Sequence, residues 1–310
     1  MTVLVASSIL RGSPEGASHG AVHLVDVTRE RVAHVLDWKA RGVDWTVPGG
    51  GRGLRGIAFD GQRVFVAAAD ALFAFSPDFE LLEVYRSPYL SKCHAIACFE
   101  RRMYVVCKGF DAILGFNLDE NRFDRGLHIR QTSSGLQGSP FDPQTAVGPG
   151  PGGSLGLNSL WCDGRGMFLS GSSTLGLLLF DVRRLERVVT LPRGVMNARP
   201  WRDGVLFNDT EAGVSRFLTP TANRVFRAPH YPERVLTGGN TGIGVPEQQG
   251  FVRGLCVVDD SMFAAGSSPS TITLHNLDTM KTIKSIALST DPRHSIHSLA
   301  IWPYAVPDQA

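Results

Sequence analysis

Residues 250–302 contain four short runs of apolar or β-branched residues. They read GFVRGLCVVDD over 250–260, SMFAAGSS over 261–268, TITLHNLDT over 271–279 and KTIKSIAL over 281–288. Asp, Gly, Ser and Pro residues separate these runs and mark turns between them. Four short strands in one antiparallel meander are the repeating unit of a β-propeller blade. This stretch is therefore predicted to form one blade and to begin the next.

The first strand of this unit recurs along the whole chain. Its other copies lie at residues 53–61, 93–99, 157–164, 196–204 and 297–302. The last copy has almost no chain after it, whereas the N-terminus carries three apolar runs with no first strand of their own, at residues 3–7, 22–27 and 31–38. We therefore predict a single all-β domain over residues 1–310, a six-bladed β-propeller. Its ring is closed by the C-terminal innermost strand, which pairs with the N-terminal strands.

Composition limits the classes of partner. The net charge is +2, which argues against a nucleic-acid surface. No apolar run reaches the roughly 18 residues that a membrane-spanning helix needs. The glycine-rich segment 238–244 lacks the Lys-Ser/Thr of a phosphate loop, so no nucleotide cofactor is expected. Five cysteines without a CxxC pair predict free thiols, and no secretory leader is evident, so a cytoplasmic location is expected.

Three long segments interrupt the repeat, at residues 39–52, 128–156 and 229–250, and all are rich in glycine or proline. Stretches of this length without regular structure are often binding loops or lids in a compact domain. They precede first strands, so they are predicted to share one rim with the starts of those strands. Tolerated surface insertions are the alternative.

One polar residue stands just before the apolar run of every first strand. Alternation along a strand would point this position toward the propeller axis. The axial channel is then predicted to be ringed by two arginines, two histidines and two asparagines. These six ring residues are Arg55, His94, Asn158, Asn197, Arg253 and His297.

Two chemistries suit such a ring. In the first, His94, His297, Asn158 and Asn197 hold a divalent metal ion through imidazole nitrogens and amide oxygens. In the second, no metal is bound, and the imidazoles of His94 and His297 act as acid and base. Under either chemistry the two arginines, Arg55 and Arg253, bind a substrate carboxylate or phosphate. A channel filled with water, whose polar groups bond to one another, is the third possibility.

Further candidates are predicted near the same rim. Asp209 follows the second strand of its blade and is the best candidate for a catalytic carboxylate. Two more cationic residues are candidates for substrate binding. They are Lys108, which follows a second strand, and Arg199, which lies in the first strand at residues 196–204.

Three motifs carry a resemblance to known propellers. GSLGLNSL at 153–160, GFVRGL at 250–255 and HSIHSL at 294–299 resemble motifs of a bacterial six-bladed propeller family whose functions are largely uncharacterised. That family is distantly similar to the NHL-repeat and SMP-30/gluconolactonase-like propellers. The resemblance implies a divalent cation held by axial Asn and carboxylate residues. Asn158 and Asn197 match the asparagines, but no axial Asp or Glu matches the carboxylate, and Gly156 stands where the family tends to have His.

The sequence thus predicts an enzyme that binds a small anionic metabolite in a polar axial pocket. Hydrolysis, elimination or isomerisation, with or without a metal ion, would suit these residues. The alternative is a propeller without catalytic activity that senses a ligand or binds another protein.

Overall fold

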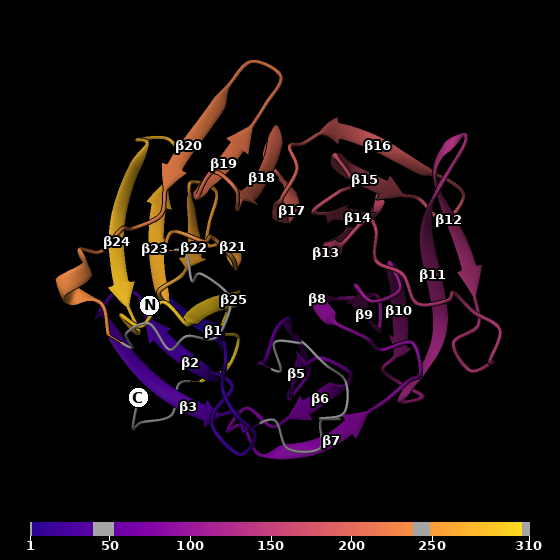
Figure 1. Cartoon of the computed structure of the whole chain (residues 1–310), viewed down its shortest axis with the longest axis horizontal. Helices are drawn as coiled ribbons and strands as arrows, with labels where there is room; N and C mark the ends of the chain where they lie inside the picture. The colour runs from indigo at the N-terminus through magenta and orange to yellow at the C-terminus, as the bar shows by residue number, and fades with distance from the viewer. Residues whose placement is uncertain (1, 40–52, 238–248, 306–310) are drawn as a thin grey trace.

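The computed structural model describes residues 2–39, 53–237 and 249–305. Six antiparallel sheets are arranged as blades around a central axis, which confirms the predicted six-bladed β-propeller (Figure 1). We number the blades by their order around the ring. Within the described ranges no helix is long and apolar enough to cross a membrane.

The first three blades contain the N-terminal half of the chain. Blade 1 has the order β25-β1-β2-β3, blade 2 runs from β4 to β7, and blade 3 runs from β8 to β12. Their strands are β1 (Val3–Leu10), β2 (Ala21–Asp26), β3 (Arg31–Asp37), β25 (His294–Ile301), β4 (Ile57–Asp60), β5 (Arg63–Ala67), β6 (Leu72–Phe75), β7 (Leu81–Tyr85), β8 (Cys93–Phe99), β9 (Arg102–Cys107), β10 (Ala112–Asn117), β11 (Arg122–Thr132) and β12 (Gly135–Phe141).

Blades 4 to 6 are four-stranded meanders, and each begins at the axis. Their strands are β13 (Leu157–Asp163), β14 (Gly166–Gly171), β15 (Gly176–Phe180), β16 (Leu185–Thr190), β17 (Val195–Trp201), β18 (Gly204–Asp209), β19 (Val214–Leu218), β20 (Asn223–Arg227), β21 (Leu255–Val257), β22 (Met262–Ser267), β23 (Thr271–Asn276) and β24 (Lys281–Ala287). A short 3₁₀ turn, η1 (Glu233–Val235), lies in the connection between blades 5 and 6.

The ring closes where the two ends of the chain meet. The C-terminal strand β25 pairs with β1 in a register that runs from Leu4 opposite Ile301 to Leu10 opposite His294. Beyond that ladder, the backbone N–H of Trp302 donates to the carbonyl of Val3 at 2.9 Å. This pairing leaves no open edge between the first and last blades, as the sequence predicts.

Most of the core lies between blades, because each sheet is apolar on both of its faces. Between blades 1 and 2, Trp38 meets the ring of Phe73 edge-on with centroids 4.8 Å apart. Between blades 2 and 3, the ring centroids of Phe65 and Phe116 lie 6.3 Å apart, and both side chains are fully buried. Every blade is therefore held by its two neighbours, and the innermost strands remain to line the axis.

The predicted rim segments are only partly irregular. Residues 128–141, which the sequence predicts as part of a loop, instead extend β11 and form β12, a fifth, outer strand of blade 3. Ile129, in the extended part of β11, is buried. Pro140 is tolerated in β12 because β12 is an edge strand. Of the other two segments, residues 40–52 and 238–248 lie outside the described residues.

Backbone hydrogen bonds link the starts of inner strands to the turns between second and third strands. The N–H of Cys93 donates to Ala69 at 3.0 Å, and the N–H of Gly194 donates to Ser172 at 2.9 Å. Gly250 makes the same kind of bond to Ser268, at 2.7 Å. These turns and strand starts therefore lie at one end of the axis, which we call the mouth.

Candidate functional site in the axial shaft

The ring positions coincide with irregularities in the inner strands. In β8, β13, β17 and β25 the ladder to the neighbouring strand shifts register at the ring residue, which is the signature of a β-bulge. Arg55 and Arg253 lie just before β4 and β21, each followed by a glycine. A bulge re-aims a side chain that regular alternation would direct elsewhere. The ring is therefore built by bulges as well as by the alternation that the sequence suggests.

Two ring residues meet at the axis. The imidazoles of His94 and His297 lie with their centroids 4.4 Å apart, although β8 and β25 belong to blades separated by blade 2. Their exposed fractions are only 4% and 3%. Among the described residues the Nδ1 atom of each ring has no hydrogen-bond partner. The sequence prediction that these two histidines converge is therefore correct in geometry.

Burial holds both imidazoles in the neutral form. It lowers the pKa of His94 well below its ordinary value, and the nearby cations Arg55, Arg253 and Lys108 lower that pKa further. Burial likewise lowers the pKa of His297, with His94 and the two arginines adding to the effect. Near neutral pH the pair is thus uncharged and can both donate and accept a proton.

Cationic side chains surround this pair. Burial lowers the pKa of Arg253 to about 9, and Arg11 and Arg55 lower it as well. The pKa of Lys108 is lowered by burial first and then by Arg253 and Arg55. Within the described part of the chain no carboxylate forms an ion pair with Arg253 or Lys108. Asp111 acts on the pKa of Lys108 in the opposite direction, so the positive charge at the mouth is only partly offset by this carboxylate.

The guanidinium groups are held in place by aromatic and backbone contacts. Arg253 lies over the ring of Phe251 at 4.4 Å, and Arg11 lies over the same ring at 5.4 Å. Arg55 donates through Nη1 to the carbonyl of Cys93 at 3.1 Å. Stacking and carbonyl bonds fix a guanidinium without neutralising it.

The two ring asparagines serve as bridges between blades. Asn158 donates through Nδ2 to the carbonyl of Val195 at 2.9 Å, and its Oδ1 accepts the hydroxyl of Ser159 at 2.7 Å. Asn197, with a left-handed φ of 57°, accepts at Oδ1 from the N–H of Gly254 at 3.0 Å. Nδ2 of Asn208 donates to the same Oδ1 at 3.2 Å. Both amide oxygens are therefore already committed to protein donors.

These contacts bear on the predicted metal site. Among the described residues no group of three or more His, Cys, Asp or Glu side chains is gathered so that it could hold a metal ion. The oxygens of Asn158 and Asn197 are occupied, and the neighbouring arginines and Lys108 would repel a dication. Two imidazoles alone make a poor divalent site. The residues present do not fit a divalent cation at this ring.

Asp209, the predicted catalytic carboxylate, is engaged elsewhere. Its Oδ2 accepts from Nε of Arg216 at 2.9 Å, and its Oδ1 accepts from the N–H of Ala212 at 3.1 Å. It does not line the cavity at the axis. The structure therefore brings together His94, His297, Arg55, Arg253 and Lys108 but leaves Asp209 in a separate ion pair.

A cavity of about 500 Å³ runs along the axis on the side of the imidazoles away from the mouth; we call it the shaft. Residues from all six inner strands line it, among them His94, Asn197 and His297. The blades surround this axis in Figure 1. Arg199 lines the shaft with its guanidinium 3.5 Å from the ring centroid of Trp161. Arg199, a candidate for substrate binding by its sequence, therefore lies on the axis, below the ring rather than at the mouth.

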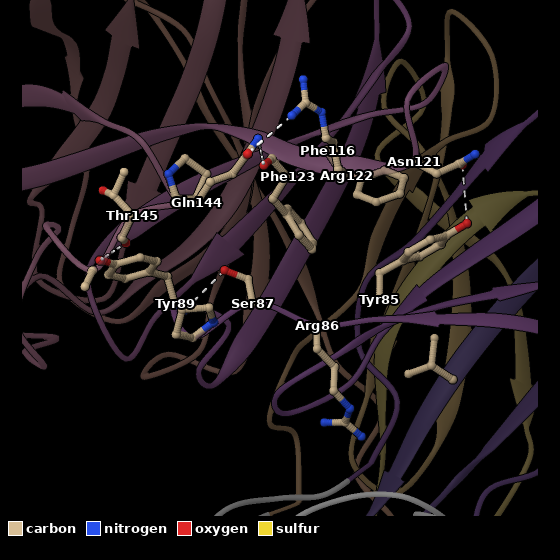
Figure 2. A pocket seen from close by; sticks show the side chains of 14 residues that line it. Tyr85, Arg86, Ser87, Tyr89, Phe116, Asn121, Arg122, Phe123, Gln144 and Thr145 are labelled. Carbon is tan, nitrogen blue, oxygen red and sulfur yellow. Dashed lines mark hydrogen bonds between the residues drawn. The ribbon is translucent and has the colours of Figure 1, made fainter.

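A second, larger hollow lies on the outside of the ring, between blades 2 and 3. Figure 2 shows hydrogen bonds among several of the residues that line it. The hydroxyl of Tyr85 donates to Asn121 at 3.3 Å, and Arg122 donates to Gln144 at 3.2 Å. Arg86 pairs with Asp70 at 3.2 Å. With these polar groups bonded to one another and its surface open, this hollow is a weaker candidate site than the axis.

Comparisons with known proteins give the fold. No family model matches the sequence, and no curated protein matches it. A chain of a nidogen/laminin complex is 12% identical, with 96% of this chain and 98% of that chain covered and a TM-score of 0.57. A protein of unknown function from Bacteroides caccae is 9% identical, with coverages of 98% and 99% and a TM-score of 0.57. The chain is therefore a six-bladed β-propeller that shares its overall fold with both proteins, and at such low identity the likeness extends no further than the fold.

Proposed function

We propose that the protein binds a small anionic metabolite at the mouth of the axis and moves a proton on it with the imidazole pair. The observation that carries this proposal is the contact of two buried, neutral imidazoles, those of His94 and His297. They lie beside Arg253 and Lys108, neither of which forms an ion pair with a carboxylate among the described residues. A carboxylate or phosphate would supply the missing negative charge. Arg253 and Lys108 would hold that anion through charge-assisted hydrogen bonds.

The bound anion would also change the imidazoles. Both pKa values are lowered by burial and by nearby positive charge, so a negative group beside them would raise both. One imidazole could then take a proton from the ligand while the other donates one. Proton transfer next to a bound carboxylate is the step that isomerases and lyases share, and activation of water by the same imidazole would give hydrolysis. A metal-assisted version is less well supported, because the ring residues do not fit a divalent ion.

One observation favours a second candidate, a ligand-binding propeller without catalytic activity. Imidazoles whose pKa values lie well below the ordinary value are weak bases near neutral pH. In that case the pair would only bond to the ligand. Substitution separates the two: His94→Gln and His297→Gln keep a polar group at the axis but remove the titrating group, so catalysis would be lost while binding persists.

The binding step is tested by calorimetric titration with inorganic phosphate and malonate. Arg253→Met and Lys108→Met should each weaken binding by about 10- to 100-fold, because each removes a charged hydrogen bond worth about 1.5–3 kcal/mol. Arg165→Met is the matched control, since Arg165 is an exposed arginine paired with Asp163 at 2.7 Å. Equal affinity in Arg253→Met and the wild type, or no binding of either anion, would exclude the proposal. Titration with Mg²⁺, Mn²⁺ and Zn²⁺ tests the metal-assisted version in parallel.

A further inference from the structure

The shaft has a second ring of equivalent residues, two positions after the first in each inner strand. Five of the six positions are aliphatic and the sixth is arginine. All six line the cavity, and the five aliphatic residues are 6–9% exposed. We call these five the aliphatic collar, and they are Ile57, Ile96, Leu160, Leu255 and Leu299. Arg199 is the single exception in a position that the repeat otherwise keeps apolar.

Arg199 has little to compensate its charge. Its guanidinium stacks on Trp161, which comes from the neighbouring inner strand β13. Its Nε atom is buried and has no hydrogen-bond partner among the described residues, and within those residues no carboxylate forms an ion pair with it. A buried cation without a partner is costly. Stacking on one face leaves the edge of the guanidinium, with its N–H donors, available to a planar anion.

The rest of the shaft suits an apolar group. Away from the imidazoles the cavity continues past Phe59, Val257 and Ile301. Its volume of about 500 Å³ lies in the range of small-molecule sites, which runs from about 300 to 1,000 Å³. One cation on an apolar wall complements a molecule with one negative end and an apolar body.

We infer that the shaft is a second binding site, for a monocarboxylate with an aliphatic or aromatic tail. The carboxylate pairs with the edge of Arg199, and the tail lies within the aliphatic collar. This site is independent of the anion site proposed at the mouth. The buried imidazoles of His94 and His297 lie between the mouth cations and the shaft, and the two sites use different arginines.

The test is a titration of the full chain with octanoate, followed by calorimetry and by tryptophan fluorescence. Octanamide, which has the same tail without the charge, is titrated alongside. Arg199→Met should weaken octanoate binding at least 10-fold and leave octanamide binding within about 2-fold. Leu255→Asn should weaken both ligands. Trp161→Phe retains a stacking ring and should remove the fluorescence change while calorimetric binding remains.

Controls separate this site from the mouth. Arg165→Met removes an exposed arginine that also lies over an aromatic ring, Phe168, and should bind octanoate like the wild type. Arg253→Met should lose phosphate affinity and retain octanoate affinity, so either site can fail alone. Octanoate binding that is undetectable at millimolar concentration, or that is equal in Arg199→Met and Arg165→Met, would overturn the inference.

Discussion

Replacement of Arg199 by methionine should stabilise the protein. Burial lowers the pKa of this guanidinium to about 10, well below the ordinary value of arginine. A lowered pKa for a cation means that folding disfavours the charged form, and this cost persists at every pH below about 10. With about 1.36 kcal/mol for each pKa unit, this cost is on the order of 3 kcal/mol. Methionine has a similar length, carries no charge and leaves no unpaired Nε.

Part of this gain is offset by the loss of stacking on Trp161, which lies 3.5 Å from the guanidinium. A partly buried cation–π contact is worth about 1–2 kcal/mol, so the net gain should be about 1–2 kcal/mol. The assay is equilibrium urea unfolding at pH 7.5, followed by circular dichroism because the substitution alters tryptophan emission. The midpoint should rise while the slope stays constant. Arg165→Met, which breaks an exposed ion pair, should change stability by less than about 0.5 kcal/mol. If Arg199→Met instead lowers the free energy of unfolding, Arg199 is a structural residue and the reasoning about its charge fails.

Three further predictions follow from single residues. His275 is buried, and burial lowers its pKa to about 4. Between pH 6.5 and pH 5 the unfolded chain therefore takes up a proton that the folded protein does not, so the free energy of unfolding should fall by about 2 kcal/mol. His275→Gln should reduce the difference between the urea midpoints measured at pH 7.5 and at pH 5. The buried carboxylate of Asp111 accepts the N–H groups of Leu155 at 2.7 Å and Leu157 at 3.1 Å. Asp111→Asn should therefore lower the free energy of unfolding by about 1.5–3 kcal/mol. An unchanged melting temperature in differential scanning calorimetry would show that these bonds contribute nothing. Gly56→Ala would place a methyl group 2.7 Å from backbone atoms of β8. Thermal melting should then show a free energy of unfolding lower by about 1–3 kcal/mol, and titration should show weaker phosphate binding. Gly150→Ala is the control and should leave both unchanged, because a methyl group there has nothing within 4 Å.

The blades and the closure of the ring could be predicted from the sequence because both depend on a repeated local pattern. Each innermost strand carries the same apolar run after one polar residue, and six copies reinforce a signal that is weak in any one of them. The convergence of His94 and His297 follows from that alignment alone. Residues 128–141 could not be assigned in the same way, because the added strand β12 has no counterpart in the described parts of the other blades.

The chemistry of the site depends on contacts that a sequence pattern does not contain. Nothing in the sequence shows that Asp209 forms an ion pair with Arg216, because the two residues lie on adjacent strands whose register is fixed only by folding. The amide oxygens of Asn158 and Asn197 suit a metal ion by residue type, yet both accept protein donors: that of Asn158 the hydroxyl of Ser159 in the same strand, and that of Asn197 the N–H of Gly254 from the next blade. The sequence around Arg199 does not by itself indicate that this residue lines the shaft. Its position becomes evident when the residue two places after each ring residue is compared across blades.

That comparison is the reason to expect a ligand in the shaft. A repeat supplies its own reference, because six copies of one strand position share the same distance from the axis and nearly the same surroundings. Five of them follow the physical rule for a confined apolar channel, and burial of an arginine at the sixth costs stability. Packing does not require that cost, since a leucine or isoleucine would complete the collar. A residue that opposes both the repeat and the stability of the fold is one whose charge is used in binding.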